Sequence, residues 1–174
     1  NRIVNQSLDT AIKSNPAPLY SKSFATRIST GNFDDDMSKI AQADWVIEVV
    51  VERLDIKKSV FERVEQFRKP GTLITSNTSG IPIHLMAEGR SEDFKDHFCG
   101  THFFNPPRYM RLVEIIATSH TQPDVLDQLE TWLTSALGKG VIRALDTPNF
   151  VANRIGVFSI LAAMHHTARL GLAF

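Results

Sequence analysis

A short apolar run, Trp45 to Val51, is followed almost at once by an amphipathic stretch, Leu54 to Phe67, and this succession constrains the fold most strongly. The run is rich in β-branched residues and is interrupted only by Glu48, which is typical of a strand buried on both faces of a parallel sheet. The second stretch repeats apolar residues at helical spacing until Pro70-Gly71 ends it. A strand that leads directly into such a helix indicates an α/β protein.

The alternation of strands and helices continues along most of the chain. Further strands are predicted at Ala25–Ser29, Thr72–Thr75, Phe98–Phe104, Leu112–Ala117 and Val141–Leu145. Further helices are predicted at Arg2–Lys13, Asp34–Gln42, Ile83–Glu88 and Val125–Leu137. Strands separated by helices favour a doubly wound sheet whose strands are mostly parallel.

The C-terminal part of the sequence has a different character. From Phe150 to Leu172 the chain carries a long helical pattern that is apolar over a wide surface, and Pro148 marks its start. A helix this apolar requires partners on several sides. We therefore expect residues 1–145 to form one unit and residues 146–174 to begin a second, helical unit, unless another subunit covers the helix.

Charge and cysteine content exclude several classes of protein. Nineteen Lys and Arg balance nineteen Asp and Glu, so no net field attracts nucleic acid or an anionic membrane. No apolar run reaches the roughly 20 residues that span a bilayer. Cys99 is the only cysteine, which rules out an internal disulfide and suits a reducing cytoplasm. The acids Asp34–Asp36 indicate a helix start, and no metal site is expected.

Polar residues follow three predicted strands, at the edge where doubly wound sheets bind ligands. They are Glu52, the cluster Ser76–Ser79, and His102–Asn105. His102 precedes two Phe residues, and Glu114 lies twelve residues later in the next predicted strand. A histidine oriented by a carboxylate is the usual arrangement of a general base that takes a proton from an alcohol. By spacing alone, the alternative interpretation is a core histidine and a glutamate that faces water.

Four motifs resemble one known family. The stretch Gly100–Pro106, which reads Gly-Thr-His-Phe-Phe-Asn-Pro, and the following Leu112–Ile116 resemble the 3-hydroxyacyl-CoA dehydrogenases. Val46–Lys57, Ser76–Ser79 and Asp146–Arg154 match the same family in the same order. The amino-acid sequence of Asp146–Arg154 is most similar to the dehydrogenase part of bacterial fatty-acid-oxidation proteins that also carry an enoyl-CoA hydratase part.

The resemblance implies a fold, a reaction and a set of site residues. The fold is a Rossmann-type doubly wound sheet, here incomplete, followed by the first helix of an all-α domain for substrate and dimer contacts. The reaction is oxidation of (S)-3-hydroxyacyl-CoA to 3-oxoacyl-CoA with NAD in fatty-acid β-oxidation. His102 is then the catalytic base and Glu114 its partner. Substrate-binding residues are Ser79, Asn105 and Asn153, and cofactor-binding residues are Glu52, Lys57, Asn77 and Ser79.

The sequence departs from the family in two places. The Gly-x-Gly-x-x-Gly loop that holds the pyrophosphate of NAD is absent, so we expect this chain alone to show little turnover. Separately, the resemblance implies that the full-length protein forms a homo-oligomer. Asn149 stands where many relatives have Gly; Asn tolerates similar backbone angles, and little effect is expected.

Two other functions remain open at this stage. One is a non-catalytic, Rossmann-like assembly module; the other is a related 3-hydroxybutyryl-CoA or crystallin-type dehydrogenase. A discrete oligomer that does not bind NAD would favour the assembly module.

Overall fold

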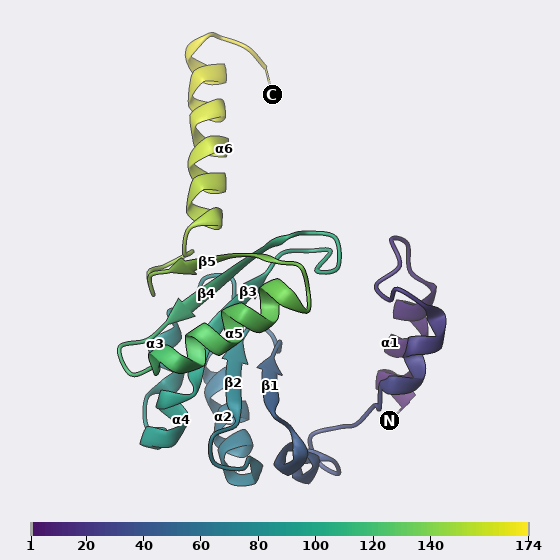
Figure 1. The fold of residues 1–174 in the computed structure, drawn as a ribbon. Helices are drawn as coiled ribbons and strands as arrows, with labels where there is room; N and C mark the ends of the chain where they lie inside the picture. The colour runs from purple at the N-terminus through teal and green to yellow at the C-terminus, as the bar shows by residue number, and fades with distance from the viewer. Residues whose placement is uncertain (1, 174) are drawn as a thin grey trace.

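The computed structural model describes residues 2–173, and its centre is a five-stranded sheet (Figure 1). The strands follow one another in chain order: β1 (Trp45–Glu48), β2 (Leu73–Ser76), β3 (Phe98–Phe103), β4 (Leu112–Ala117) and β5 (Gly140–Ala144). Neighbouring strands run parallel except β3 and β4, which are antiparallel. The predicted α/β class and its mostly parallel sheet are therefore confirmed.

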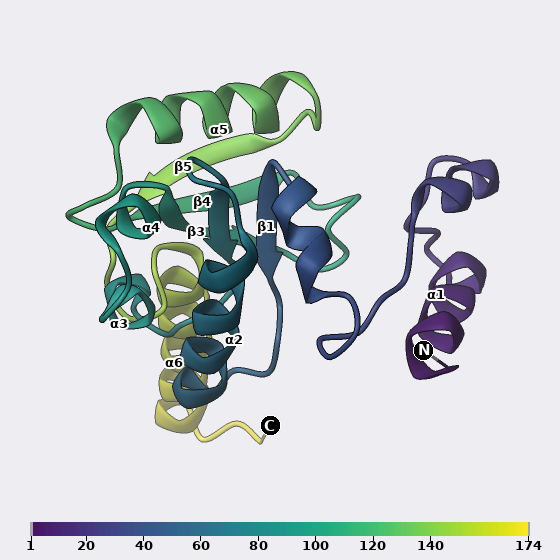
Figure 2. The ribbon, with the colours of Figure 1, turned by 90° about the horizontal axis from the view of Figure 1, so that it is seen from below.

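Helices form a layer on each face of this sheet (Figure 2). One face carries α2 (Leu54–Phe67), α3 (Ile83–Ala87) and α4 (Glu92–Asp96), and the other carries α5 (Pro123–Ser135). Successive side chains of a strand point to opposite faces, so each strand contributes to both cores. Phe98 packs with Phe61 and Phe94 in the first core, whereas the next residue, Cys99, packs in the second.

Gly100 allows α3 to lie close to the sheet near the predicted site. A Cβ at this position would lie 2.7 Å from Ile83 Cδ1 and 3.1 Å from Ile116 Cδ1. Contacts this short force neighbouring atoms to move, so only glycine fits without rearrangement. The position is two residues before His102, which makes the local packing of α3 part of what places that histidine.

One predicted strand is wrong, and another strand and a helix are shorter than expected. The strand predicted at Trp45–Val51 ends at Glu48, and Ile47 is exposed, so it is not buried on both faces. Ala25–Ser29 falls largely in a 3₁₀ helix, η1 (Lys22–Arg27), which Ser21 begins by accepting the amide of Ser23. A strand needs a neighbour for its backbone hydrogen bonds, and this segment lies outside the described sheet. The helix expected at Asp34–Gln42 is also 3₁₀ and spans Met37–Gln42 (η2).

The two ends of the described chain extend away from the sheet (Figure 1). Near the N-terminus, α1 (Arg2–Lys13) stands apart, and the chain after it is held by Arg108, whose guanidinium donates to the carbonyls of Ala17 and Leu19 at 2.7 and 2.8 Å. Near the C-terminus, α6 (Ala152–Arg169) projects outward with no buried residue. None of the helices described for residues 2–173 combines the length and apolar character needed to cross a bilayer.

Candidate active site

The centre of the candidate site is a contact between His102 and Glu114. The antiparallel register of β3 and β4 places the two residues directly opposite each other, so their side chains share one face of the sheet. Nδ1 of His102 lies 2.7 Å from Oε2 of Glu114, and the side chains are 5% and 0% exposed. The structure thus brings together the pair that the sequence singled out.

Aromatic rings keep the surroundings of His102 apolar. The rings of Phe104 and Phe150 lie 4.4 and 5.8 Å from the imidazole, measured between centroids. Because Nδ1 is engaged with Glu114, Nε2 is the ring nitrogen left to accept a proton. A carboxylate on the other nitrogen orients the ring and stabilises the imidazolium that forms after proton uptake.

The second oxygen of Glu114 binds the start of α6. Oε1 accepts the amides of Val151 and Ala152 at 2.9 and 2.8 Å. Amides at a helix N-terminus favour a negative charge nearby. With His102 on Oε2 and the two amides on Oε1, both oxygens of this buried carboxylate have a hydrogen-bond partner. Sequence analysis did not identify this contact, because nothing in the side chains of Val151 or Ala152 marks their amides as partners of Glu114.

Glu52 organises the loop that follows β2. Its Oε1 accepts the amides of Ser79 and Gly80 at 2.9 and 3.3 Å and the hydroxyl of Thr78. Burial raises the pKa of Glu52, but the hydrogen bonds from Thr78 and Ser79 and the charge of Lys57 outweigh it, so the pKa is lowered from 4.5. The ionised carboxylate therefore holds Ser79 in place at the end of β2.

Lys57 lies in a buried ion network rather than at the surface. Its Nζ is 2.9 and 3.0 Å from the two oxygens of Glu48 and 3.3 Å from Oε2 of Glu52. The side chains of Lys57 and Glu48 are each 1% exposed, and Ser76 donates its hydroxyl to Glu48 at 2.6 Å. Direct cofactor contact by Lys57 stays a prediction; its described role is to join Glu52 to the sheet.

Glu48 is a site residue that sequence reasoning missed. The available signal was its position as the only charge inside the apolar run Trp45–Val51. A buried charge requires a partner, and the next Lys on the inner face of α2 is Lys57. The pair therefore connects β1 to α2 beneath the predicted site.

Three asparagines were predicted at the site, and two of them hold its parts together. Asn77 accepts the amide of Phe103 at 2.9 Å, which ties the loop after β2 to the residue that follows His102. Asn153 donates to the carbonyl of Ser79 at 2.9 Å, which ties the first turn of α6 to the same loop. Asn105 is exposed and lies in a separate hollow of about 370 Å³ between the β3–β4 connection and residues 14–18.

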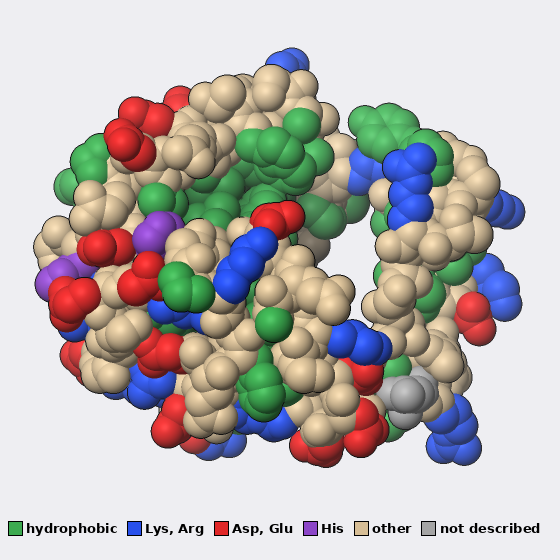
Figure 3. Space-filling view, turned by 60° about the horizontal axis from the view of Figure 1, so that its bottom comes forward, with side chains coloured by type: hydrophobic (Ala, Val, Ile, Leu, Met, Phe, Trp, Pro, Cys, Tyr) green, Lys and Arg blue, Asp and Glu red, His purple; other side chains and the backbone are tan. Residues whose placement is uncertain are grey.

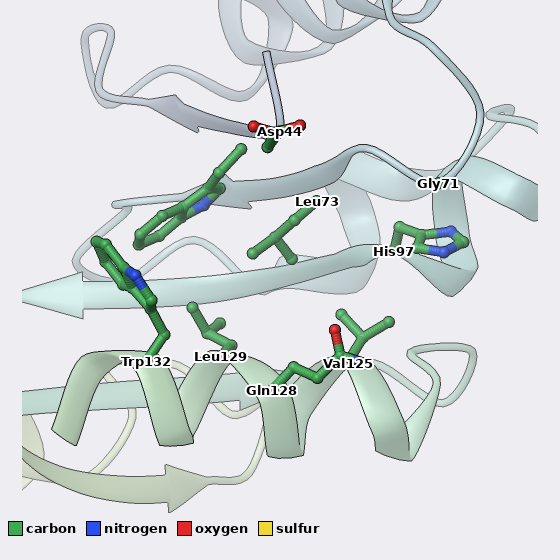
Figure 4. A pocket seen from close by; sticks show the side chains of 9 residues that line it. Asp44, Gly71, Leu73, His97, Val125, Gln128, Leu129 and Trp132 are labelled. Carbon is green, nitrogen blue, oxygen red and sulfur yellow. The ribbon is translucent and has the colours of Figure 1, made fainter. Parts of the chain in front are cut away.

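A larger hollow lies elsewhere, where β1 and β2 begin (Figure 4). It has a volume of about 600 Å³, and α5 forms one wall. Trp45 and Trp132 meet there edge to face at 5.2 Å, and Trp45 donates to Thr75. None of the predicted site residues lines it, so volume alone does not identify the site.

Figure 3 shows apolar side chains gathered in a hollow of one face, with acidic and basic side chains interspersed around it.

Two further kinds of site were sought among residues 2–173: a group of metal ligands and a reactive thiol. No group of three His, Cys, Asp or Glu side chains in this part of the chain is arranged to hold a metal ion. Cys99 is fully buried, and burial raises the pKa of its thiol to about 12. A thiol with that pKa is protonated at neutral pH and is a poor nucleophile.

Comparison with known proteins finds similar sequences over nearly the whole chain. Residues 3–147 match the family model described as 3-hydroxyacyl-CoA dehydrogenase, NAD binding domain. Over 98% of its length the chain is 48% identical to a probable 3-hydroxyacyl-CoA dehydrogenase of Bacillus subtilis, of which it covers 22%. Over 91% it is 39% identical to a putative fatty acid oxidation complex trifunctional enzyme of Rickettsia felis, of which it also covers 22%.

A solved structure has a similar fold. FadB2 from M. tuberculosis superposes with a TM-score of 0.78 and 27% identity, over 97% of this chain and 58% of that one. The chain thus spans less than a quarter of the length of the two relatives compared above and little more than half of the FadB2 chain.

Proposed function

The chain belongs to the 3-hydroxyacyl-CoA dehydrogenase family, and from this premise we propose the activity of the longer protein. It oxidises (S)-3-hydroxyacyl-CoA to 3-oxoacyl-CoA with NAD, in fatty-acid β-oxidation. The observation that carries the proposal is the buried contact between His102 and Glu114. The trifunctional relative supports the pathway, since its name includes fatty acid oxidation.

His102 is proposed as the base of this reaction. When bound, NAD supplies the acceptor for the hydride that leaves C3 of the substrate. Loss of that hydride makes the 3-hydroxyl group acidic, and Nε2 of His102 takes its proton as the C3–O bond becomes a carbonyl. Glu114 stabilises the resulting imidazolium through Nδ1.

The residues present fit the nicotinamide and ribose end of NAD. Glu52 is held ionised, its side chain is 46% exposed, and Ser79 is exposed beside it. A carboxylate and a hydroxyl at the ends of parallel strands are suited to bind the hydroxyls of a ribose. We assign Glu52 and Ser79 to direct contact with NAD, supported from behind by Lys57 and Asn77.

The substrate and the domain boundary are part of the same proposal. Ser79, Asn105 and Asn153 are assigned to the 3-hydroxyacyl-CoA, and the link between Asn153 and Ser79 supports placing two of them together. Residues 1–145 form the NAD-binding unit, and residues 146–174 begin a helical unit for substrate and dimer contacts. The exposed apolar side chains of α6 support a homo-oligomer of the longer protein. The single buried cysteine suits a cytoplasmic location.

The proposal is tested on the full-length protein. NADH formation is followed with (S)-3-hydroxybutyryl-CoA and NAD, and His102→Ala is expected to lower kcat by roughly 10²–10⁴-fold. His120→Ala is the matched control: this side chain is 52% exposed in the connection between β4 and α5, and its replacement keeps normal turnover. Turnover of the His102 variant near that of the unaltered protein would remove His102 from the role of base.

One observation favours a second candidate, an assembly module without catalysis. The apolar surface of α6 is exposed, and such surfaces bind other protein surfaces. A full-length protein that forms a discrete oligomer, fails to bind NAD and shows no turnover would support this candidate over the dehydrogenase.

A further inference from the structure

The chain reaches α6 through a turn with an unusual backbone. Asn149 and Phe150 have φ angles of 63° and 48°, a left-handed conformation that residues with a side chain rarely adopt. Directly after them come Val151 and Ala152, whose amides donate to Glu114. The reversal of the backbone therefore aims the start of α6 at the carboxylate.

Three contacts hold this turn in place. Phe150 is buried in the core, with its ring 5.8 Å from that of His102. A Cβ on Gly80 would lie 2.8 Å from Oδ1 of Asn149, so the Asn149 side chain rests on the loop after β2. Asp146, the residue before the turn, accepts the first two amides of α3 at 2.6 and 2.9 Å. The turn is thus tied to the core, the loop and α3.

The two amides act on one oxygen of Glu114 and leave the other to His102. Hydrogen bonds to a carboxylate favour its charged form. Without these amides, one carboxylate oxygen would be buried without a donor, and the pair would bind a proton more readily, whether on Glu114 or shared with His102. A pair that already holds a proton cannot take one from a hydroxyl.

We propose that the turn Thr147–Phe150 is a positioning element for the His102–Glu114 pair: it presents two amides of α6 to Glu114 and so keeps the pair ready to accept a proton. The kinetic consequence rests on the proposed function. The geometric part does not, because the contacts of the turn with Glu114 can be tested in the absence of substrate and cofactor.

Other charged groups around the pair have partners of their own. Glu48 of β1 pairs with Lys57 of α2, and Asp146 binds His84 of α3. Arg143 of β5 pairs with Asp127 and Glu130 of α5. Lys139 donates to the carbonyls of Pro107 and Met110. Arg154 of α6 donates to Thr147 at 3.4 Å. These partners leave the amides of Val151 and Ala152 as the described donors to Glu114 Oε1.

Asn149→Val tests the element, because a β-branched residue opposes the left-handed conformation that Asn tolerates. In the full-length protein, the midpoint of the acid limb of kcat against pH is expected to rise by about one pH unit, with kcat recovering at high pH. Asn149→Gly keeps the left-handed turn and should restore the original midpoint. Gly138→Val places the same strain (φ 63°) after α5 and should leave the midpoint unchanged.

A second readout does not depend on activity. Histidine NMR titration of the same variants, with His102 assigned by its absence in His102→Gln, is expected to show the same upward shift in Asn149→Val. A full-length protein without turnover would refute the proposed function, and the titration would still decide the role of the turn. Equal midpoints for the unaltered protein and Asn149→Val in both measurements would overturn it.

A backbone substitution covers the case in which Asn149→Val does not fold. Lactic acid in place of Ala152 replaces one amide by an ester: it removes the N–H that donates to Glu114 at 2.8 Å and weakens the Val151 carbonyl that accepts the amide of Ile155. The titration midpoint of His102 is expected to rise in this variant as well. An unchanged midpoint would show that the amide does not act on the pair.

Discussion

At the scale of single residues, Glu52 links protonation to the shape of the site. Its carboxylate accepts the amides of Ser79 and Gly80 and the hydroxyl of Thr78. The loop carries Ser79, which is proposed to touch both cofactor and substrate. The charge state of Glu52 therefore contributes to holding this loop in position, together with Asn77 and Asn153.

The lowered pKa of Glu52 predicts a pH dependence of stability. A carboxyl whose folded pKa is depressed contributes stability that is present above the unfolded value of 4.5 and is lost as pH falls through the folded value. Glu52→Gln should therefore lower the free energy of unfolding at pH 7, and the difference from the unaltered protein should shrink below pH 4.5. Urea unfolding at several pH values measures this, and a difference that stays constant down to pH 3 would contradict it.

Other residues divide into those that act directly and those that hold them. His102, Ser79, Asn105 and Asn153 are the groups proposed to meet substrate. Asn77 uses its amide to join the loop after β2 to β3. Asn153 does both, because its amide also joins that loop to α6. A change at Asn77 or Asn153 is therefore expected to displace the site as well as to remove a side chain.

At the scale of elements, the ion pair between Lys57 and Glu48 joins α2 to β1. Lys57→Met should lower the free energy of unfolding by about 3–5 kcal/mol, because it leaves Glu48 charged and buried. The double variant Lys57→Met, Glu48→Leu should recover most of this loss, since an apolar pair needs no partner charge. Chemical denaturation measures both variants, and a double variant less stable than Lys57→Met would contradict the explanation.

The contact of α3 with the sheet gives a second prediction at this scale. Gly100→Ala should lower the free energy of unfolding by about 1–3 kcal/mol, because the new Cβ would lie 2.7 Å from Ile83 Cδ1. Gly140→Ala in β5 is the matched control, since no atom lies within 4 Å of its Cβ. Equal losses at the two positions in urea unfolding would show that α3 does not pack as described.

At the scale of the whole molecule, the described chain combines a covered sheet with an uncovered helix. The sheet has helices on both faces, whereas α6 exposes apolar side chains along its length: Ile155, Val157, Phe158, Ile160, Leu161 and Met164. An apolar surface of this kind favours association with other protein surfaces.

This surface leads to a prediction about assembly. Replacing Phe158 and Leu161, which are 73% and 59% exposed, by Glu should weaken self-association of this chain. The free energy of unfolding should change little, because no residue of α6 is buried. Sedimentation velocity and urea unfolding measure the two effects, and association that persists in the variant would show that another surface is responsible.

Much of the fold follows from local patterns. The helix at Leu54–Phe67 and the strand at Leu112–Ala117 have the predicted bounds, because apolar periodicity and chain breakers are properties of consecutive residues. The strand predicted at Ala25–Ser29 is wrong, because a strand also depends on a neighbour that the local pattern does not reveal.

By itself, the sequence determined the alternation of strands and helices, the order of the family motifs and the candidates His102 and Glu114. Only the tertiary structure decided that Lys57 turns inward to Glu48 and that the amides of Val151 and Ala152 bind Glu114. The reason is physical. The periodicity of apolar residues can be read from the side chains of neighbouring residues, whereas every residue except proline carries the same backbone N–H group. Which amide meets a buried carboxylate depends on the path of the folded chain.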